Sequence, residues 1–301
     1  MATSIASIND SVVMEKAIQA LKATLIPVRN LTHEAILQLA GRPVIKGDAA
    51  VIQYASRQTA VAKTPGTEPN AGGVVAGKSV TFNQYYSAPF YVPDGAGKPG
   101  TFEALAVEAA YAIGKVVIDY VTGLVLKANY GDGDGDKVVV AAADFGNLSI
   151  AALKQKAGAK LLGRERSLIL NPLYGAQVFA DTNLGLILAF NGVKAYETGV
   201  LPDLLGMKAF EYDALSDNGE NLGGFLCDNT AIALGIAPVT PQAAPGNGDL
   251  IAMEIVTDPD SEVAMTYKRS YHSKEGAMRG EFEVLFGASV GNNSVIRIVS
   301  A

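Results

Sequence analysis

Residues 92–117 read VPDGAGKPGTFEALAVEAAYAIGKVV, and they contain a G-x-G-x-x-G pattern at Gly95, Gly97 and Gly100 that runs directly into a helical pattern. This spacing is found in loops that hold a dinucleotide pyrophosphate at a helix N-terminus. The same glycines can also form a hinge into a long structural helix. The length of the helix that follows distinguishes the two interpretations.

The apolar stripe that follows continues at three- and four-residue steps and predicts one helix from Thr101, its N-cap, to about Asn129. A dinucleotide-binding fold needs a shorter crossover helix, with an acidic residue for the ribose about 20 positions on, at the end of the next strand. That position is Asp119, inside the helix, and Pro99 removes one N–H donor from the loop. A long structural helix is therefore the preferred interpretation, and a Rossmann-type oxidoreductase is the alternative.

Composition excludes several other classes of protein. The chain has 301 residues and a formal net charge of -6, with no lysine and arginine run that could neutralise a row of phosphates, so we expect no sequence-specific nucleic-acid contact. The N-terminus lacks a secretory pattern, and no apolar stretch reaches the ~20 residues that span a bilayer, which predicts a soluble protein made in a cytoplasm. The single cysteine, Cys227, and two histidines, His33 and His272, are poor material for a zinc site or for histidine catalysis.

Two β-prone runs precede the long helix, GDAAVIQYASRQTAV at 47–61 and GKSVTFNQYYSAPFYV at 77–92. The segment between them is rich in Pro, Gly, Thr and Asn, which predicts a long hairpin. Its faces mix polar and apolar side chains, so it cannot bury a core of its own, and we expect it to rest on another surface, such as a neighbouring subunit. Upstream, residues 11–25 have helical spacing, and Pro27 is expected to end that helix and begin an extended arm.

The second half of the chain alternates helical and β-prone patterns. A helix is predicted over 148–161, and RSLILNPLYGAQVFAD at 166–181 predicts a buried strand, an Asn-Pro turn and a helix. Residues 199–215 predict a loop and a strand, and GGFLCDNTAIALGIAPV at 223–239 a strand followed by a short helix or turn. PVTPQAAPGNGD at 238–249 has the composition of a boundary, and β-prone runs follow it.

Asp132, Asp134 and Asp136 occupy the first, third and fifth positions of a calcium-loop pattern. The sixth position is Lys137, where the loop needs glycine, and the twelfth is Ala143, where a glutamate should close the shell. A solvated turn is therefore the preferred interpretation.

The sequence contains no phosphate-binding loop, nucleophile elbow or zinc-protease motif. Asp258, Asp260 and Glu262 flank Pro259, which predicts a turn and a solvated strand start, and His272 is expected at the surface. We assign no catalytic, cofactor-binding or metal-binding residue and expect no enzyme activity.

The order of these elements resembles the major capsid protein family of tailed bacteriophages, which has the Hong Kong ninety-seven type fold. The likeness lies in the hairpin strands, the helix from Thr101 to Asn129, LILNPLYGAQVF, and LPDLLGMKAFEYDAL with GGFLCDNTAIAL. The resemblance implies an α+β fold made of an N-terminal arm (1–40), an E-loop hairpin (41–95), a spine helix of the peripheral domain (96–130), an axial domain (131–248) and a return to the peripheral domain (249–301). Many relatives carry a longer N-terminal scaffolding extension, so this chain is expected to be mature or to use a separate scaffold.

The resemblance implies a structural role. Copies of the chain would form hexamers and pentamers of an icosahedral shell around double-stranded DNA, together with scaffolding, portal and decoration proteins. The shell would be the virion capsid, assembled in the cytoplasm of a host bacterium. An encapsulin-like compartment, which holds a protein cargo, is the alternative within the same fold.

Some members of this family join neighbouring subunits by an isopeptide bond between a hairpin lysine and an asparagine, assisted by a carboxylate. The corresponding residue types here are Lys63 or Lys78, Asn292 or Asn293, and Glu281 or Glu283. Neither asparagine lies in a stretch apolar enough to shift the pKa of an attacking lysine, and GASVGNNSVIR at 287–297 predicts a tight turn between two strands instead. We therefore expect a shell held by non-covalent contacts.

Overall fold

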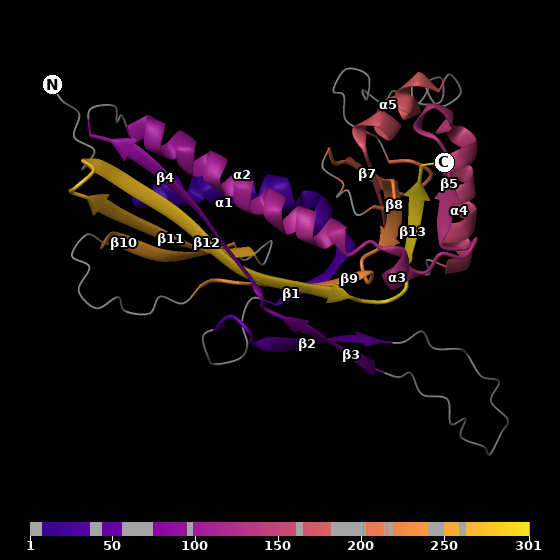
Figure 1. Ribbon diagram of the computed structural model, residues 1–301, viewed down its shortest axis with the longest axis horizontal. Helices are drawn as coiled ribbons and strands as arrows, with labels where there is room; N and C mark the ends of the chain where they lie inside the picture. The colour runs from indigo at the N-terminus through magenta and orange to yellow at the C-terminus, as the bar shows by residue number, and fades with distance from the viewer. Residues whose placement is uncertain are drawn as a thin grey trace, which may run out of the picture.

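The computed structural model describes residues 8–36, 44–55, 75–94, 99–160, 165–181, 201, 203–213, 215, 219–239, 250–258 and 263–300 (Figure 1). The helices are α1 (Asp10–Leu31), α2 (Pro99–Gly123), α3 (Lys127–Tyr130), α4 (Asn147–Lys160) and α5 (Pro172–Ala180). The strands are β1 (Thr32–Ile36), β2 (Ala49–Ala55), β3 (Val75–Thr81), β4 (Gln84–Pro93), β5 (Lys137–Val139), β6 (Arg166–Leu170), β7 (Lys208–Glu211), β8 (Leu222–Asp228), β9 (Ile232–Ala237), β10 (Leu250–Asp258), β11 (Val263–His272), β12 (Ala277–Val290) and β13 (Val295–Val299).

Two sheets form the two ends of an elongated molecule. The large sheet has the order β1-β9-β12-β11-β10, with β4 also paired to β12, and the small sheet has the order β5-β13-β8-β6-β7. α1 and α2 lie side by side across one face of the large sheet, and α4 and α5 lie at the small sheet (Figure 1). The predicted α+β class is confirmed.

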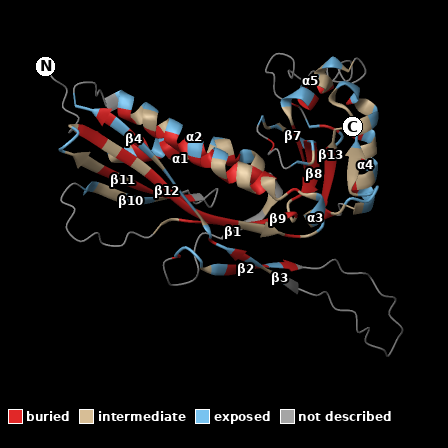
Figure 2. Cartoon of the chain, in the orientation of Figure 1, coloured by how far each residue is buried: buried red, intermediate tan, exposed pale blue. Residues whose placement is uncertain are grey.

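The apolar stripe of α2 faces the large sheet, as the sequence pattern predicts. Phe102, Ile113, Val117 and Val121 are each 2% exposed or less, while Tyr111 on the opposite side is 43% exposed (Figure 2). Complete burial of such a side chain contributes about 1.5–3 kcal/mol. The stripe therefore anchors the helix to the sheet.

The ends of α2 differ from the prediction. The helix starts at Pro99, so Thr101 lies inside its first turn and is not the N-cap, and it ends at Gly123 rather than near Asn129. A separate one-turn helix, α3, follows, and the backbone N–H of Lys127 at its start donates to both carboxylate oxygens of Glu220 at 2.9 Å. The carboxylate of Glu220, which is far away in the sequence, thus caps α3. This short helix lies inside the segment predicted to be a single helix.

Helix α1 continues through Pro27 to Leu31, so the expectation that this proline ends the helix and begins an extended arm is wrong. An internal proline costs about 3 kcal/mol. Leu25 and Val28 on either side of it are each 1% exposed in the main core. Their burial, at about 1.5–3 kcal/mol each, offsets the cost of the proline.

The hairpin of β2 and β3 rests on its own chain. Along β2, Ile52 and Tyr54 are buried while Val51 is 60% exposed, and Phe82 just after β3 is fully buried. Phe82 packs with Leu285 of β12 in a small cluster of buried side chains. The expectation that the hairpin needs another surface is correct for its base, and β9 and β12 supply that surface. Residues 56–74 lie outside the described residues.

The elements predicted for residues 148–181 are confirmed as α4, β6 and α5, and the side chain of Asn171 caps α5 by accepting from the Leu173 N–H at 3.0 Å. The loop and strand predicted near 199–215 appear as β7. The segment after β8 is a tight turn followed by strand β9. The proposed boundary at 240–249 and the acidic residues Asp260 and Glu262 lie outside the described residues.

The chain crosses between the two sheets more often than the predicted division into five contiguous ranges implies. β9, within 131–248, pairs with β12 of the large sheet. β13, within 249–301, pairs with β8 and β5 of the small sheet. The two sheets are therefore joined by several strand-to-strand connections that meet at one junction.

We expect Val117→Asp to be severely destabilising, by several kcal/mol, because it places an unpaired charge in the core between α2 and the sheet. Thermal unfolding followed by circular dichroism measures the effect. Ala112→Asp, at an exposed position of the same helix, is the matched control. Equal melting temperatures for the two variants would show that the stripe is not buried.

Candidate functional site at the junction of the two sheets

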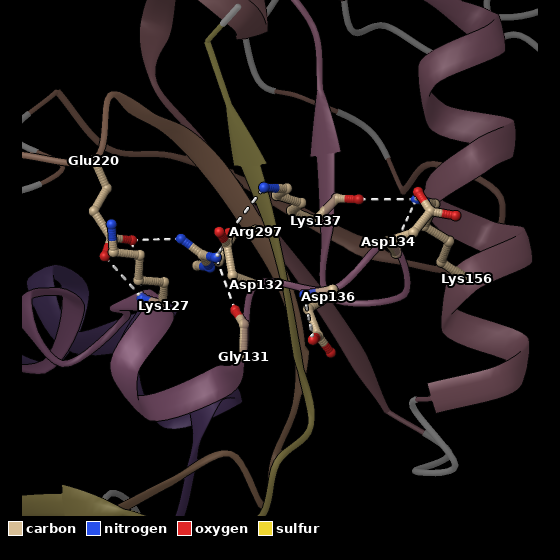
Figure 3. Close-up of polar contacts among 10 residues, drawn as sticks. Lys127, Gly131, Asp132, Asp134, Asp136, Lys137, Lys156, Glu220 and Arg297 are labelled. Atoms are coloured by element: carbon tan, nitrogen blue, oxygen red, sulfur yellow. Dashed lines mark hydrogen bonds and ion pairs between the residues drawn. The ribbon is translucent and has the colours of Figure 1, made fainter.

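The junction lies where α2 ends and the chain enters the small sheet through α3, the turn at 131–136 and β5. β13 returns to the same place from the end of β12 (Figure 1). Figure 3 shows that charged side chains from α3, the turn, α4 and β13 gather at this junction.

Arg297 on β13 is the centre of this cluster and is only 1% exposed. Its guanidinium donates to the carboxylate of Glu220, to the carbonyl oxygen of Gly131 at 2.8 Å and to Oδ1 of Asp132 at 2.8 Å (Figure 3). Its backbone N–H donates to the carbonyl of Asp136 at 2.9 Å. The planar fork of an arginine suits several acceptors held in fixed positions.

Glu220 extends this network to the short helix α3. Its side chain is 11% exposed, and its oxygens accept from Arg297 as well as from the Lys127 N–H. One carboxylate therefore connects β13, the start of α3 and the segment before β8. We name Arg297, Glu220, Asp132 and Gly131 the arginine clamp.

The three aspartates of the calcium-like pattern each pair with a different lysine. Asp132 contacts Lys137 at 2.9 Å, Asp134 contacts Lys156 at 3.0 Å, and Asp136 contacts Lys160 at 2.5 Å. In Figure 3 the labelled carboxylates Asp132 and Asp134 face separate partners. Within the described ranges, no group of three or more His, Cys, Asp or Glu residues could hold a metal ion.

These contacts lower the pKa of two of the carboxyls. Hydrogen bonds from Lys137 and Arg297 hold the pKa of Asp132 below its usual value, and the hydrogen bond from Lys160 does the same for the pKa of Asp136.

Gly131 has φ +86°, and a Cβ there would lie 2.3 Å from Oδ2 of Asp136. The turn therefore requires glycine at this position for both conformation and space.

A second contact joins α2 to the small sheet. The hydroxyl of Tyr212, just after β7, donates to Oδ1 of Asp119 at 2.6 Å. Burial and this carboxylate raise the pKa of the Tyr212 hydroxyl. Asp119, the position that a dinucleotide fold would need for a ribose, has a structural partner here.

The topology does not favour the dinucleotide alternative. Gly95 and Gly97 lie outside the described residues, and Gly100 lies in the first turn of α2. β4 pairs antiparallel with β12, and the strand that follows α2, β5, belongs to the small sheet. A dinucleotide-binding unit needs two parallel strands of one sheet joined by the helix.

The two carboxylates considered for covalent cross-linking each pair with a cation of the same chain. Lys63 lies outside the described residues and Lys78 lies on β3. Glu281 pairs with Arg279 at 2.8 Å, and Glu283 pairs with Lys268 at 2.5 Å.

Asn292 and Asn293 lie in the turn between β12 and β13, which confirms the predicted tight turn. A Cβ at Gly291 would lie 2.3 Å from the carbonyl oxygen of Thr230, and the Asn292 N–H donates to that oxygen at 2.9 Å. Glycine is therefore required at position 291, because the backbone of Thr230 lies too close for a side chain.

Cys227 and His272 pack against other parts of the fold. Cys227 is fully buried on β8, and burial raises the pKa of its thiol well above the usual value. His272, at the end of β11, is half-buried and meets the ring of Tyr91 edge to face at 6.3 Å. His33 lies on β1.

Sequence reasoning did not find the arginine clamp. Arg297 is a single cation inside the apolar run VIRIV, which signals a buried charge that needs a partner. Its partners are more than 70 residues away along the chain, with separations of 77 and 165 residues to Glu220 and Asp132. The residue type was therefore visible in the sequence, but its partners were not.

Comparison of the fold with solved structures places it among bacteriophage capsids. The chain superimposes on the capsid structure of cyanophage P-SCSP1u with a TM-score of 0.53 at 14% identity, covering 90% of each chain. The capsid of Ralstonia phage GP4 gives a TM-score of 0.54 at 8% identity, covering 85% of each chain. Neither protein-family models nor curated protein sequences give a match. The chain thus has the fold of phage capsid proteins, and the resemblance seen in the sequence is confirmed at the level of the fold.

We expect Arg297→Ala to lower the free energy of unfolding by about 3–5 kcal/mol, because it leaves the carboxylate of Glu220 buried without its cation. Arg297→Lys should cost less, since an ammonium keeps the charge but not the fork. Urea unfolding measures both variants. Lys208→Ala, which removes an exposed contact to Glu165 at 4.0 Å, should change stability by less than about 0.5 kcal/mol. An Arg297→Ala variant as stable as this control would contradict the role of the clamp.

Stability should also depend on Asp136 in a defined pH range. Its folded-state pKa lies below the ordinary 3.8, so its contribution is fully present above that pH and is lost as the pH falls through the folded-state pKa. We expect Asp136→Asn to melt below the wild type at pH 7, with the difference shrinking below about pH 4. Asp134→Asn, whose side chain is fully exposed, should show a much smaller difference. A gap for Asp136→Asn that stays constant down to pH 2 would contradict this assignment.

Proposed function

We propose that this chain is a major capsid protein, a structural subunit that assembles with its own copies into an icosahedral shell around a phage double-stranded DNA genome. The observation that carries the proposal is the fold. Two phage capsids share it over 85–90% of both chains with TM-scores above 0.5. Both of these neighbours are structural proteins of virions, so the fold favours a structural role over an enzymatic one.

The shape of the molecule supports a shell subunit. It is elongated, with the α1–α2 layer and large sheet at one end, the small sheet at the other, and the hairpin beside them (Figure 1). Such a molecule presents a large lateral surface for contacts with copies of itself. We assign residues 1–40 as the N-terminal arm, 41–95 as the E-loop, 96–130 as the spine helix, 131–248 as the axial domain and 249–301 as the return to the peripheral domain. Within the arm, helix α1 packs in the main core and is not extended. The pairing of β9 and β13 exchanges these two strands between the last two ranges.

In this proposal the partners are other copies in hexamers and pentamers, with separate scaffolding, portal and decoration proteins. The net charge of -6 suits a wall that encloses DNA without tight or sequence-specific contact. The protein would be located in the virion capsid after assembly in the host bacterial cytoplasm. Within the part of the chain that the structure describes, no helix has the length and apolar character needed to cross a membrane.

The arginine clamp would have a mechanical role in such a subunit. It joins the end of the spine helix to the small sheet through a buried, hydrogen-bonded cation, and Tyr212 adds a second contact to Asp119. The angle between the two ends of the subunit sets how neighbouring subunits meet, and hence the curvature of the shell. A fixed junction favours closed particles of one size.

Negative-stain electron microscopy of the purified protein tests the proposal, and we expect closed shells. Deletion of 64–73, a polar and glycine-rich segment outside the described residues, should leave a folded subunit that no longer forms shells. Boiling the shells in detergent should release one band near 31.3 kDa, since we expect non-covalent contacts. Small discrete oligomers that bind a nicotinamide dinucleotide would instead support the oxidoreductase, and shells that retain a defined protein cargo would support an encapsulin-like compartment.

A further inference from the structure

Strand β10 forms an outer edge of the large sheet and exposes apolar side chains there. Among the described residues it pairs with β11 alone. Leu250, Ile251 and Ile255 are 46%, 51% and 47% exposed. A nine-residue edge strand with exposed aliphatic side chains is a ready template for another strand.

The other edge strands of the two sheets carry features that prevent strand addition. β4 contains Pro89 and ends at Pro93, and a proline cannot donate to a new ladder. β1, β5 and β7 have only five, three and four residues, and the last two carry Lys137 and Lys208. β10 has neither proline nor lysine, and after a register shift between Leu250 and Ala252 its ladder with β11 is regular up to Asp258. Within the described ranges this regular part is the one long edge of these sheets that remains open to pairing.

We propose that β10 pairs antiparallel with β10 of a second copy of this chain, about a two-fold axis that passes through Met253. In this register Ala252 lies opposite Glu254 of the other copy, within the part of β10 whose ladder with β11 is regular. Ile255 meets Ile251, the residue that the ladder with β11 skips at its register shift. Aliphatic pairs opposite each other stabilise a sheet, whereas like charges opposite each other destabilise it. The strand is therefore complementary to itself in one particular register.

The neighbouring registers are less favourable. An axis through Glu254 would place this carboxylate opposite its own copy, and an axis through Ala252 would place Leu250 opposite Glu254. Only the axis through Met253 pairs both isoleucines and keeps the two glutamates apart.

This inference rests on the proposed function, because a shell built from one chain supplies two-fold contacts between copies. Two paired strands bury too little area to hold a dimer alone. The pairing should therefore be weak between free subunits and strong in the shell, where each contact is supported by many others.

A disulfide test measures the register. In assembled shells of Met253→Cys, mild oxidation should produce a disulfide-linked dimer on a non-reducing gel, since directly opposite Cα atoms lie about 4.5–5.5 Å apart and within disulfide range. Glu254→Cys is the matched control. Its two copies would be offset along the strands, about 8 Å apart and beyond disulfide range. The native Cys227 is fully buried and should not contribute.

A second variant tests the contact without a disulfide. Ile255→Lys, at an exposed position, should leave the melting curve of the free subunit unchanged but place an ammonium against Ile251 of the other copy. We expect the yield of shells to fall at least about tenfold. Leu148→Lys, exposed on α4, carries the same charge change elsewhere on the surface and should have a smaller effect.

The outcomes separate this inference from the proposed function. Shells that form normally but give no Met253→Cys dimer, or give equal dimer with Glu254→Cys, would overturn the strand pairing and leave the capsid role intact. Wild-type protein that forms no shells would overturn the capsid role. A Met253→Cys dimer that is specific for that position and depends on assembly would support both.

Discussion

The structure depends on the close packing of β12 against its neighbours. This strand pairs with β4, β11 and β9, and it leads directly into β13 of the small sheet. Two glycines let other elements approach it: a Cβ at Gly280 would lie 2.2 Å from the ring of Phe90, and one at Gly287 would lie 2.0 Å from the carbonyl oxygen of Thr81. A larger side chain at Gly280 or Gly287 would therefore displace Phe90 of β4 or the hairpin strand β3 from β12.

The arginine clamp shows how segments that are far apart in the sequence are held together at the junction. Burial of charges costs desolvation energy, and apolar residues of similar volume are often at least as stabilising. A buried guanidinium with partners in two segments besides its own strand, however, accepts only one arrangement of those segments. For a subunit whose neighbours must meet at defined angles, such orientation is worth more than added stability. The proposed pairing of β10 would set the same requirement between copies, because the register would decide which copies can meet.

Much of the fold could be predicted from the sequence. The stripe of α2 and the strand, turn and helix of residues 166–181 follow from periodicity and local capping, which are short-range properties. The errors lie where distant parts of the chain intervene. Helix α1 continues through Pro27 because core burial compensates for the proline. α2 ends at Gly123, and Glu220 caps the separate helix α3 at Lys127. The candidate site could not be predicted, since Arg297 and its carboxylates are far apart along the chain.

The sequence by itself determined the secondary structure of most segments, the α+β class and the likeness to phage capsid proteins, because apolar spacing and turn residues act locally. Only the tertiary structure decided that the base of the hairpin packs on β9 and β12, that three aspartates of one turn face three different lysines, and that β13 leaves its neighbours in sequence to complete the small sheet. The physical reason is that pairing of strands and burial of charges depend on which surfaces meet, and those surfaces come from residues that the linear sequence keeps apart.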